Sequence, residues 1–396
     1  MKHAIVLSAL VSLAAVLCAQ PRSEQHSALT RDGAHWVLTT QGTAPCSLIG
    51  TLRIATRGRV VLRGASVDRI QYSVTQRVKV RTELEARKAF GAVVVNTKPR
   101  GETTTLALMT VDKPGVVTEV TLKVPKSLHE ATVETQIGGV EVTDMDGMIS
   151  AITTAGQVSV DRIGANALAK TGGGEIRIGK VGGTVRCNSG AGSIFVESAR
   201  GETWCDTAGG EISVREVGGP LHAYTEGGNI QVERAIASVS ARSGEGLIEV
   251  TQAGGLVVAE TRGGSIQVGN ARGVRCDSGA GTIRFRSMAG PVRASTGFGS
   301  ILAELVSGAR LEDSSLTAGS GDVTVLIPAS LSLAVQARND SGASFGKIIS
   351  DFPEIRPKVS DYDRARPWIA EGVLNGGGPV LRISATGGTI YIRRQR

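Results

Sequence analysis

The sequence predicts an all-β protein, a single-stranded parallel β-helix or solenoid built from 18-residue rungs with two strands each. Three observations support this prediction: apolar residues recur at a fixed interval, they alternate with polar residues, and the composition is unusual. The chain has 52 Gly in 396 residues and only 3% aromatic residues. A core of β-branched and small side chains suits a stack of thin coils better than one globular core.

The fixed interval is clearest at the residue that follows each glycine-rich turn. These residues form a first apolar ladder of Val140, Val158, Ile176, Ile194, Ile212, Ile230, Ile248, Ile266, Ile283 and Ile301. The interval is 18 throughout, except that one residue is missing before Ile283. A second apolar residue follows two positions after each member, so both side chains lie on one face of a strand. Stacked rungs would therefore form parallel, in-register sheets.

A second strand is predicted nine residues after the first in each rung. Its inward positions carry an apolar residue, then a small residue, then a hydroxyl. This hydroxyl ladder runs from Thr153 to Ser314, and we expect it to bond to backbone groups at the corners, because a buried hydroxyl needs a partner. Glycine recurs in both turns, because a tight coil needs either a positive φ or a close backbone approach there.

The period divides the chain into five segments. We expect a signal peptide at 1–19, a flexible mature N-terminus at 20–46, an irregular β-rich region at 47–135, the regular solenoid at 136–327, and C-terminal rungs with a cap at 328–396. The signal peptide is indicated by a charged start and an apolar run too short to cross a bilayer. The alternative is a lipid anchor on Cys18.

The flanking segments carry two further expectations. A short helix is predicted at 83–90, which is rich in Glu, Ala, Arg and Lys. An uncovered sheet end invites stacking with another molecule, so we expect an apolar cap over the C-terminal end of the solenoid. Its aromatic members would be Phe345, Phe352, Tyr362 and Trp368.

Charge and hydropathy narrow the class of partner. The formal net charge is +8, but no Lys/Arg run concentrates it. We therefore expect anionic envelope polymers or a surface protein as partner, and no nucleic acid. After the first apolar run, no stretch is long enough for a transmembrane span. The predicted location is outside the cytoplasm: periplasm, cell surface or extracellular space.

The rungs of the pattern Gly-Gly-x-Ile-x-Val, the strand VTLKVP at 120–125 and the closing TGGTIYI at 386–392 resemble a bacterial "putative adhesin" family of unknown function. The resemblance covers roughly residues 50–392. It implies a non-catalytic, adhesin-like envelope protein that binds partners or acts as a scaffold. It carries over no functional residues.

The sequence shows no motif for a cofactor, a metal or a catalytic nucleophile. The histidines have no metal-ligand spacing, and the glycine runs lack the Lys-Ser/Thr ending of a phosphate loop. We therefore expect no cofactor and no enzymatic activity. Two alternatives stay open: a polysaccharide-degrading enzyme, by analogy with other β-helices, and a self-assembling scaffold.

Outward positions of the second strand supply the predicted binding residues. They form two neighbouring columns, with Arg186, Trp204 and His222 in one and Asp206, Tyr224 and Arg242 in the other. Aromatic and cationic groups on a flat face suit a ligand with sugar rings and anionic groups, such as an envelope polysaccharide. The alternative is an ordinary solvated sheet with one exposed Trp.

The inward side of the same strands carries cysteines. Cys187 and Cys205 lie one rung apart, and in-register neighbours are close enough for a disulfide. In an oxidising compartment a bridge between them is one prediction. The other is that inward Cys, alternating with Ala, is a small apolar core filler.

Overall fold

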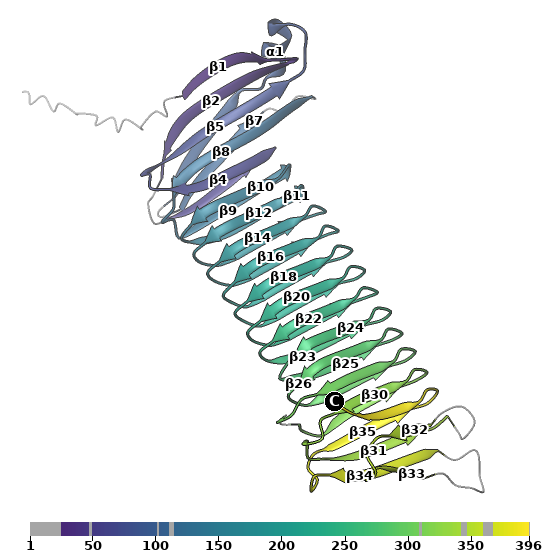
Figure 1. Cartoon of the computed structure of the whole chain (residues 1–396). Helices are drawn as coiled ribbons and strands as arrows, with labels where there is room; N and C mark the ends of the chain where they lie inside the picture. The colour runs from purple at the N-terminus through teal and green to yellow at the C-terminus, as the bar shows by residue number, and fades with distance from the viewer. Residues whose placement is uncertain are drawn as a thin grey trace, which may run out of the picture.

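The computed structural model of the chain describes residues 25–46, 50–100, 103–110, 115–308, 311–341, 347–358 and 367–395. It is an elongated rod (Figure 1), a parallel β-solenoid of about 11 turns with 64% strand and one helix in these residues. The predicted fold is therefore confirmed. The predicted signal peptide and Cys18 lie outside the described residues, as do Phe345 and Tyr362.

Two sheets run the length of the rod, and each strand belongs to one of them. Sheet A contains, in spatial order, β1 (Gln25–Asp32), β2 (His35–Pro45), β5 (Arg69–Val78), β8 (Val116–Pro125), β4 (Arg59–Ala65), β10 (Val140–Met145), β12 (Val158–Ile163), β14 (Ile176–Val181), β16 (Ile194–Ala199), β18 (Ile212–Val217), β20 (Ile230–Ala235), β22 (Ile248–Ala253), β24 (Ile266–Asn270), β26 (Ile283–Met288), β28 (Ile301–Leu305), β30 (Val323–Ile327), β36 (Ile390–Arg394) and β32 (Ile348–Ser350).

Sheet B faces it. In spatial order it contains β6 (Val93–Arg100), β7 (Thr103–Thr110), β3 (Thr51–Thr56), β9 (Glu130–Ile137), β11 (Met148–Ala155), β13 (Ala167–Thr171), β15 (Val185–Ser189), β17 (Thr203–Thr207), β19 (Leu221–Thr225), β21 (Val239–Ser243), β23 (Leu256–Thr261), β25 (Gly273–Ser278), β27 (Val292–Thr296), β29 (Ser314–Ala318), β35 (Val380–Ala385), β31 (Leu333–Asn339), β34 (Trp368–Leu374) and β33 (Arg356–Lys358).

In the centre of the rod each strand pairs in parallel with the strands one coil before and after it. Ile212 lies opposite Ile194 on one side and Ile230 on the other, as the 18-residue interval predicts. The repeat is one residue shorter between Ile266 and Ile283, yet these two residues still lie opposite each other. The register is therefore kept. The inward ladders are buried and form one continuous core along the rod. Apolar burial in this core holds the two sheets together.

The hydroxyl ladder ties the corners of successive coils together. Thr225 Oγ1 donates to the carbonyl oxygen of Gly210 at 2.9 Å and accepts from the backbone N–H of Gly228 at 3.1 Å. Ser243 makes the same pair of bonds one coil later. The expected bonding to corner backbone is therefore confirmed from Thr153 to Thr296, and it explains why a polar residue is buried there. The expectation was wrong for Ser314, because Ala318 takes the position opposite Thr296 and Ser314 bonds instead to Glu312 O and Val292 N–H.

The glycines at this corner are required mainly by close backbone approach. A Cβ on Gly228 would lie 2.0 Å from the carbonyl oxygen of Gly210, whereas a Cβ on the neighbouring Gly227 would meet nothing within 4 Å. At the first corner of the regular region both causes act, since Gly156 also has a φ of 140°. Of the two reasons expected from the sequence, close approach is therefore the general one.

At the N-terminal end the coils do not follow sequence order. The coil of β3 and β4 lies between the coil of β7 and β8 and that of β9 and β10. Antiparallel strands β5, β2 and β1 extend sheet A beyond it, and β6 extends sheet B. The predicted helix is present as α1 (Glu83–Ala89) and begins with a capping box between Thr82 and Glu85. Its Ala86 packs in a small apolar cluster with Val78.

Residues 25–46 differ from the flexible terminus that we expected. β1 and β2 form an antiparallel hairpin, and β2 pairs with β5 along nearly its whole length. Val37, Thr40 and Ala44 on β2 are buried. The parallel 18-residue period carries no signal for this pairing, because it is antiparallel and lies outside the repeat. The boundaries of the five predicted segments stay predictions.

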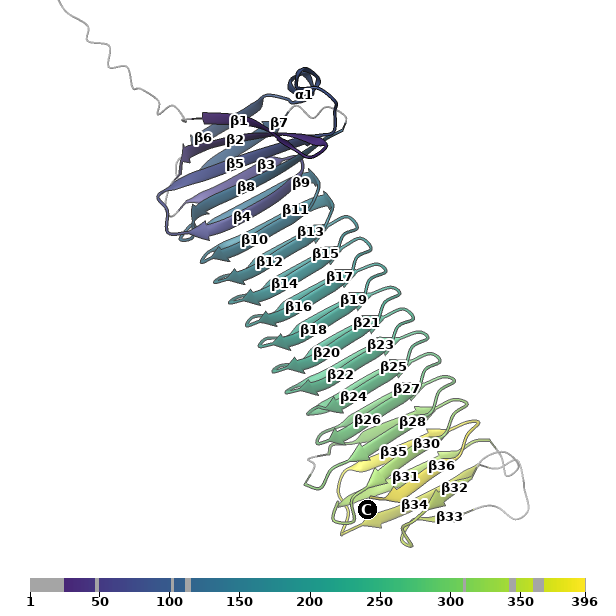
Figure 2. The ribbon, with the colours of Figure 1, turned by 45° about the horizontal axis from the view of Figure 1, so that its top comes forward.

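The C-terminal end is also built out of sequence order. The coil of β35 and β36, the last in the chain, lies between the coil of β29 and β30 and that of β31 and β32. Antiparallel strands β34 and β33 then extend sheet B (Figure 2). Of the predicted aromatic cap, Phe352 is buried in the core cluster and Trp368 packs against it.

Candidate functional site

All six predicted binding residues lie on the outward face of sheet B. They come from four consecutive strands of sheet B, β15, β17, β19 and β21, in which buried and exposed positions alternate. The side chain of His222 is half-buried and the other five are exposed. The parallel register places them in two adjacent columns, as the sequence predicts. Whether they bind a ligand stays a prediction.

The first column is a stack of three planar groups. The rings of Trp204 and His222 are stacked, with centroids 3.9 Å apart and an angle of 16° between their planes. The guanidinium carbon of Arg186 lies 5.8 Å from the indole centroid. Because Arg186 and His222 come from the coils on either side of Trp204, both faces of the indole are covered. Trp204 is nevertheless 42% exposed, so what it presents to solvent is its edge.

This geometry changes the expected mode of contact. A sugar ring that stacks on Trp204 would have to displace one of its two neighbours, whereas a ligand lying flat on the sheet would touch the edges of all three groups. His222 is held in the stack by Glu202, whose carboxylate lies 3.3 Å from Nε2. We call this column, Arg186, Trp204 and His222, the aromatic ladder.

The second column is polar, with one large ring. Tyr224 is 45% exposed and lies between Asp206 and Arg242 in register. Arg242 Nε donates to Glu260 Oε2 at 2.9 Å, one coil further along. The column therefore offers a phenol, a carboxylate and an ion pair within a few coils.

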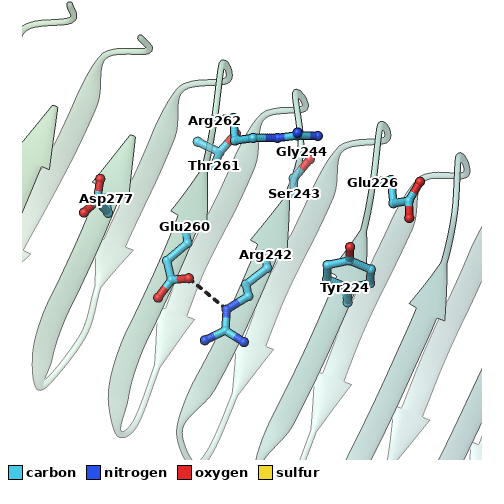
Figure 3. A pocket seen from close by; sticks show the side chains of 9 residues that line it. All are labelled: Tyr224, Glu226, Arg242, Ser243, Gly244, Glu260, Thr261, Arg262 and Asp277. Carbon is cyan, nitrogen blue, oxygen red and sulfur yellow. Dashed lines mark hydrogen bonds and ion pairs between the residues drawn. The ribbon is translucent and has the colours of Figure 1, made fainter. Parts of the chain in front are cut away.

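An open groove of about 750 Å³ begins at this column and runs along the corner. Figure 3 shows Tyr224 and the Arg242–Glu260 pair among the residues that line it. Its other charged residues are Glu226, Arg262 and Asp277. Sequence reasoning did not select Glu226, Glu260, Arg262 or Asp277. Extending the two columns by further intervals of the repeat would have found Glu260 and Asp277, which continue the column of Tyr224 in register.

The cysteines of sheet B lie inside the rod. Cys187 and Cys205 are register partners, both are buried, and both are free thiols in this structure. A hydrogen bond with Cys205, together with burial, holds the pKa of Cys187 well above its usual range. Burial likewise raises the pKa of Cys276. High thiol pKa values disfavour the thiolate that starts disulfide exchange, so the bridge stays a prediction that an oxidising compartment would have to drive.

Neither a metal site nor a membrane helix is found in the described part of the chain. No group of three or more His, Cys, Asp or Glu residues there could hold a metal ion. No helix among those residues has the length and apolarity to cross a bilayer.

Comparison with known proteins gives one family match and distant structural similarities. The model of the family described as Toastrack DUF4097 matches residues 51–346. A solved "putative cell adhesion protein" from Clostridium sporogenes is 8% identical, with 94% of this chain and 100% of that chain covered and a TM-score of 0.19. For a "putative adhesin" from Bacteroides fragilis the identity is 9%, the coverages are 90% and 97%, and the TM-score is 0.19. No curated protein matches.

Proposed function

The chain belongs to the toastrack DUF4097 family, and from the outward face of its sheet B we propose that it is a non-catalytic, adhesin-like binding protein of the bacterial cell envelope. In this proposal the protein is exported, and the rod is a rigid support that presents side chains to an envelope polysaccharide or a surface protein. The ligand would lie across the coils and touch the aromatic ladder and the column of Tyr224.

One observation carries the proposal: the aromatic ladder lies beside an open groove on a flat face. Folding alone gives little reason for an indole that is 42% exposed on a strand. The indole edge, the imidazole and the guanidinium together offer apolar contact and hydrogen-bond donors in one plane. Tyr224 and Arg242 extend this plane into the groove. Such combinations of aromatic and Arg side chains are typical of binding surfaces.

The alternative of a self-assembling scaffold requires rods to stack end to end, and the C-terminal end is poorly suited to this. The outermost C-terminal strands, β32 and β33, have three residues each, and β33 contains Pro357. Short strands and proline at a sheet edge hinder pairing with another chain. End-to-end stacking of rods through this end would therefore gain few backbone hydrogen bonds.

The polysaccharide-degrading alternative would use the carboxylates of the groove. Glycoside hydrolysis generally needs two carboxyl groups on either side of the scissile bond. Glu260 is engaged by Arg242. The other two carboxylates of the groove, Glu226 and Asp277, lie three coils apart, about 14 Å at the usual strand spacing, which is more than the roughly 5–9.5 Å that hydrolysis needs. Release of reducing ends from envelope glycans by the wild-type protein, lost on changing Glu226→Gln, would replace the binding proposal by this one.

The test compares two outward aromatic residues on opposite sheets. Trp204→Ser removes the centre of the aromatic ladder, and Phe195→Ser removes a ring on sheet A that lies 5.5 Å from the guanidinium carbon of Arg177. Retention on purified envelope glycans and on surface-protein extracts is measured for both. We expect Trp204→Ser to weaken retention by roughly fivefold, a loss on the order of 1 kcal/mol, and Phe195→Ser to leave it unchanged. Equal retention of the wild-type protein and Trp204→Ser would overturn the proposal.

A further inference from the structure

Acidic and basic side chains are separated along the rod. Between residues 194 and 260 the sequence has ten acidic residues and four arginines. Between residues 263 and 303 it has five arginines and a single acid, Asp277, and the next acid along the chain is Glu304 on β28. The coils that carry the aromatic ladder are thus acidic, and the coils that follow them are basic.

The five arginines surround the rod. Arg284 and Arg286 are on β26 in sheet A, Arg275 and Arg293 are on β25 and β27 in sheet B, and Arg272 lies at the corner between the sheets. All five are exposed. We call them the arginine band. Since the band reaches both faces and one corner, a flat surface could touch only part of it.

Within the part of the chain that the structure describes, the arginines of the band form no ion pair, in contrast to Arg242 and Arg382. Of the five, only Arg293 lies near enough to a described carboxylate to affect it, since the pKa of Asp313 is lowered chiefly by a hydrogen bond from the Val380 backbone N–H and also by the charge of Arg293. Arg242 pairs with Glu260 at 2.9 Å and Arg382 with Asp313 at 3.2 Å. In the described residues no ion pair or side-chain hydrogen bond involves any member of the band. Arg275 lies directly opposite Arg293 in register, and like charges in that position are mutually destabilising. Most of the charge of the band is therefore left for something outside the chain to neutralise.

Sheet A provides a recess beside two of these arginines. Arg284 and Arg286 line a hollow of about 110 Å³ together with Gln267 and Gly269. The neighbour of Arg284 in register is neutral Gln267 on one side and apolar Leu302 on the other. One carboxylate, Glu249, lies at the far side of the hollow, two coils away. Two guanidinium groups on one strand face can bind an oxyanion through several N–H donors.

We propose that the arginine band is a second binding site, separate from the aromatic ladder, for a linear polymer that carries phosphate or carboxylate groups. A flexible chain can follow arginines that face in different directions, which a membrane surface cannot. The outward positions of β24 to β27 hold no aromatic ring on which bases could stack, and the exposed ring of Phe298 lies in the turn after β27, so single-stranded nucleic acid is disfavoured. The neighbouring acidic coils repel a polyanion and confine it to the band.

The test uses defined polymers and matched double variants. Polyphosphate and polygalacturonate are the probes for the two oxyanions, and binding of the full chain is measured by titration calorimetry at low and high salt. The band variant is Arg284→Gln with Arg286→Gln. The control is Arg215→Gln with Arg234→Gln, which also removes two exposed arginines from sheet A, but from the acidic coils. Thermal melting checks that both variants fold.

We expect the wild-type protein to bind at least one polymer, more weakly as salt rises, and the band variant to bind it roughly tenfold more weakly. The polymer that binds more tightly identifies the oxyanion. The control and Trp204→Ser should keep wild-type affinity, so this result is independent of the fate of the aromatic ladder. Equal binding by the band variant would overturn the proposal. Tighter binding of duplex DNA, or salt-sensitive self-association without polymer binding, would overturn it in favour of those partners.

Discussion

The centre of the rod and its two ends solve the same structural problem in different ways. In the centre each coil stacks on the coil that precedes it in the sequence, with parallel strands in one register. At each end a coil is inserted between two others out of sequence order. Antiparallel strands close both sheets at the N-terminal end and sheet B at the C-terminal end. Stacking of sequence neighbours can continue without limit, whereas the end arrangements stop it.

The centre and the ends are stabilised by different kinds of contact. A central coil contacts mainly its two neighbours, so its stability depends on local packing. The ends depend on contacts between segments that are far apart in the sequence, such as Asp351 beside β32 with Arg393 on β36. The centre should therefore respond to changes in its ladders, and the ends to changes in specific side-chain links.

The largest effect is expected from an inward substitution in the centre. Ile212 is fully buried, and Ile212→Ser removes apolar burial and adds a hydroxyl without a partner. We expect a loss of about 3–5 kcal/mol in the free energy of unfolding. Trp204→Ser, one strand away but outward, should cost about 1 kcal/mol through loss of its contacts with His222 and Arg186. Denaturant unfolding monitored by circular dichroism measures both, and similar losses would mean that the inward and outward faces are assigned wrongly.

A smaller effect is expected at the corner glycines. Gly228→Ala places a Cβ 2.0 Å from the carbonyl oxygen of Gly210, so the two coils must separate locally. We expect a loss of about 1–3 kcal/mol, as for other overpacked sites. The matched control is Gly227→Ala, next in the chain, whose Cβ would meet nothing within 4 Å. Equal melting temperatures for the two variants would contradict close approach as the reason for glycine at this corner.

The same contrast explains how much the sequence alone could predict. The position of Ile212, the bonding of Thr225 and the columns of the candidate site follow from a repeat that fixes register one coil at a time. The insertion of β35 and β36 between earlier coils leaves no such trace, because each strand reads as an ordinary apolar alternation. The stacking of His222 on Trp204 also depends on rotamers, so the sequence suggested an open indole face where the structure has a covered one.

The smallest effect is expected at the C-terminal end and depends on pH. Asp351 accepts from the Arg393 guanidinium at 2.8 Å and from the Arg394 backbone N–H at 3.1 Å. These contacts, the Arg393 hydrogen bond first, lower the pKa of Asp351 below its ordinary value. A lowered carboxyl pKa stabilises the folded state above the unfolded pKa, and this contribution is lost as pH falls through the folded pKa.

Asp351→Asn should therefore destabilise the link between β32 and β36 at neutral pH and make little difference in strong acid. The pair is partly exposed to solvent, so screening limits the loss to less than about 1 kcal/mol. Hydrogen exchange of the β36 amides at neutral pH and below pH ~3 measures the effect where it acts. The control is Asp340→Asn, since Asp340 pairs with Arg338 only two residues away and joins no separate strands.

Faster exchange in Asp351→Asn at both pH values would mean that its charge contributes nothing to the link. Unchanged exchange at neutral pH would mean that backbone pairing alone, such as Asp351 N–H to Ile392 O at 2.9 Å, holds this end.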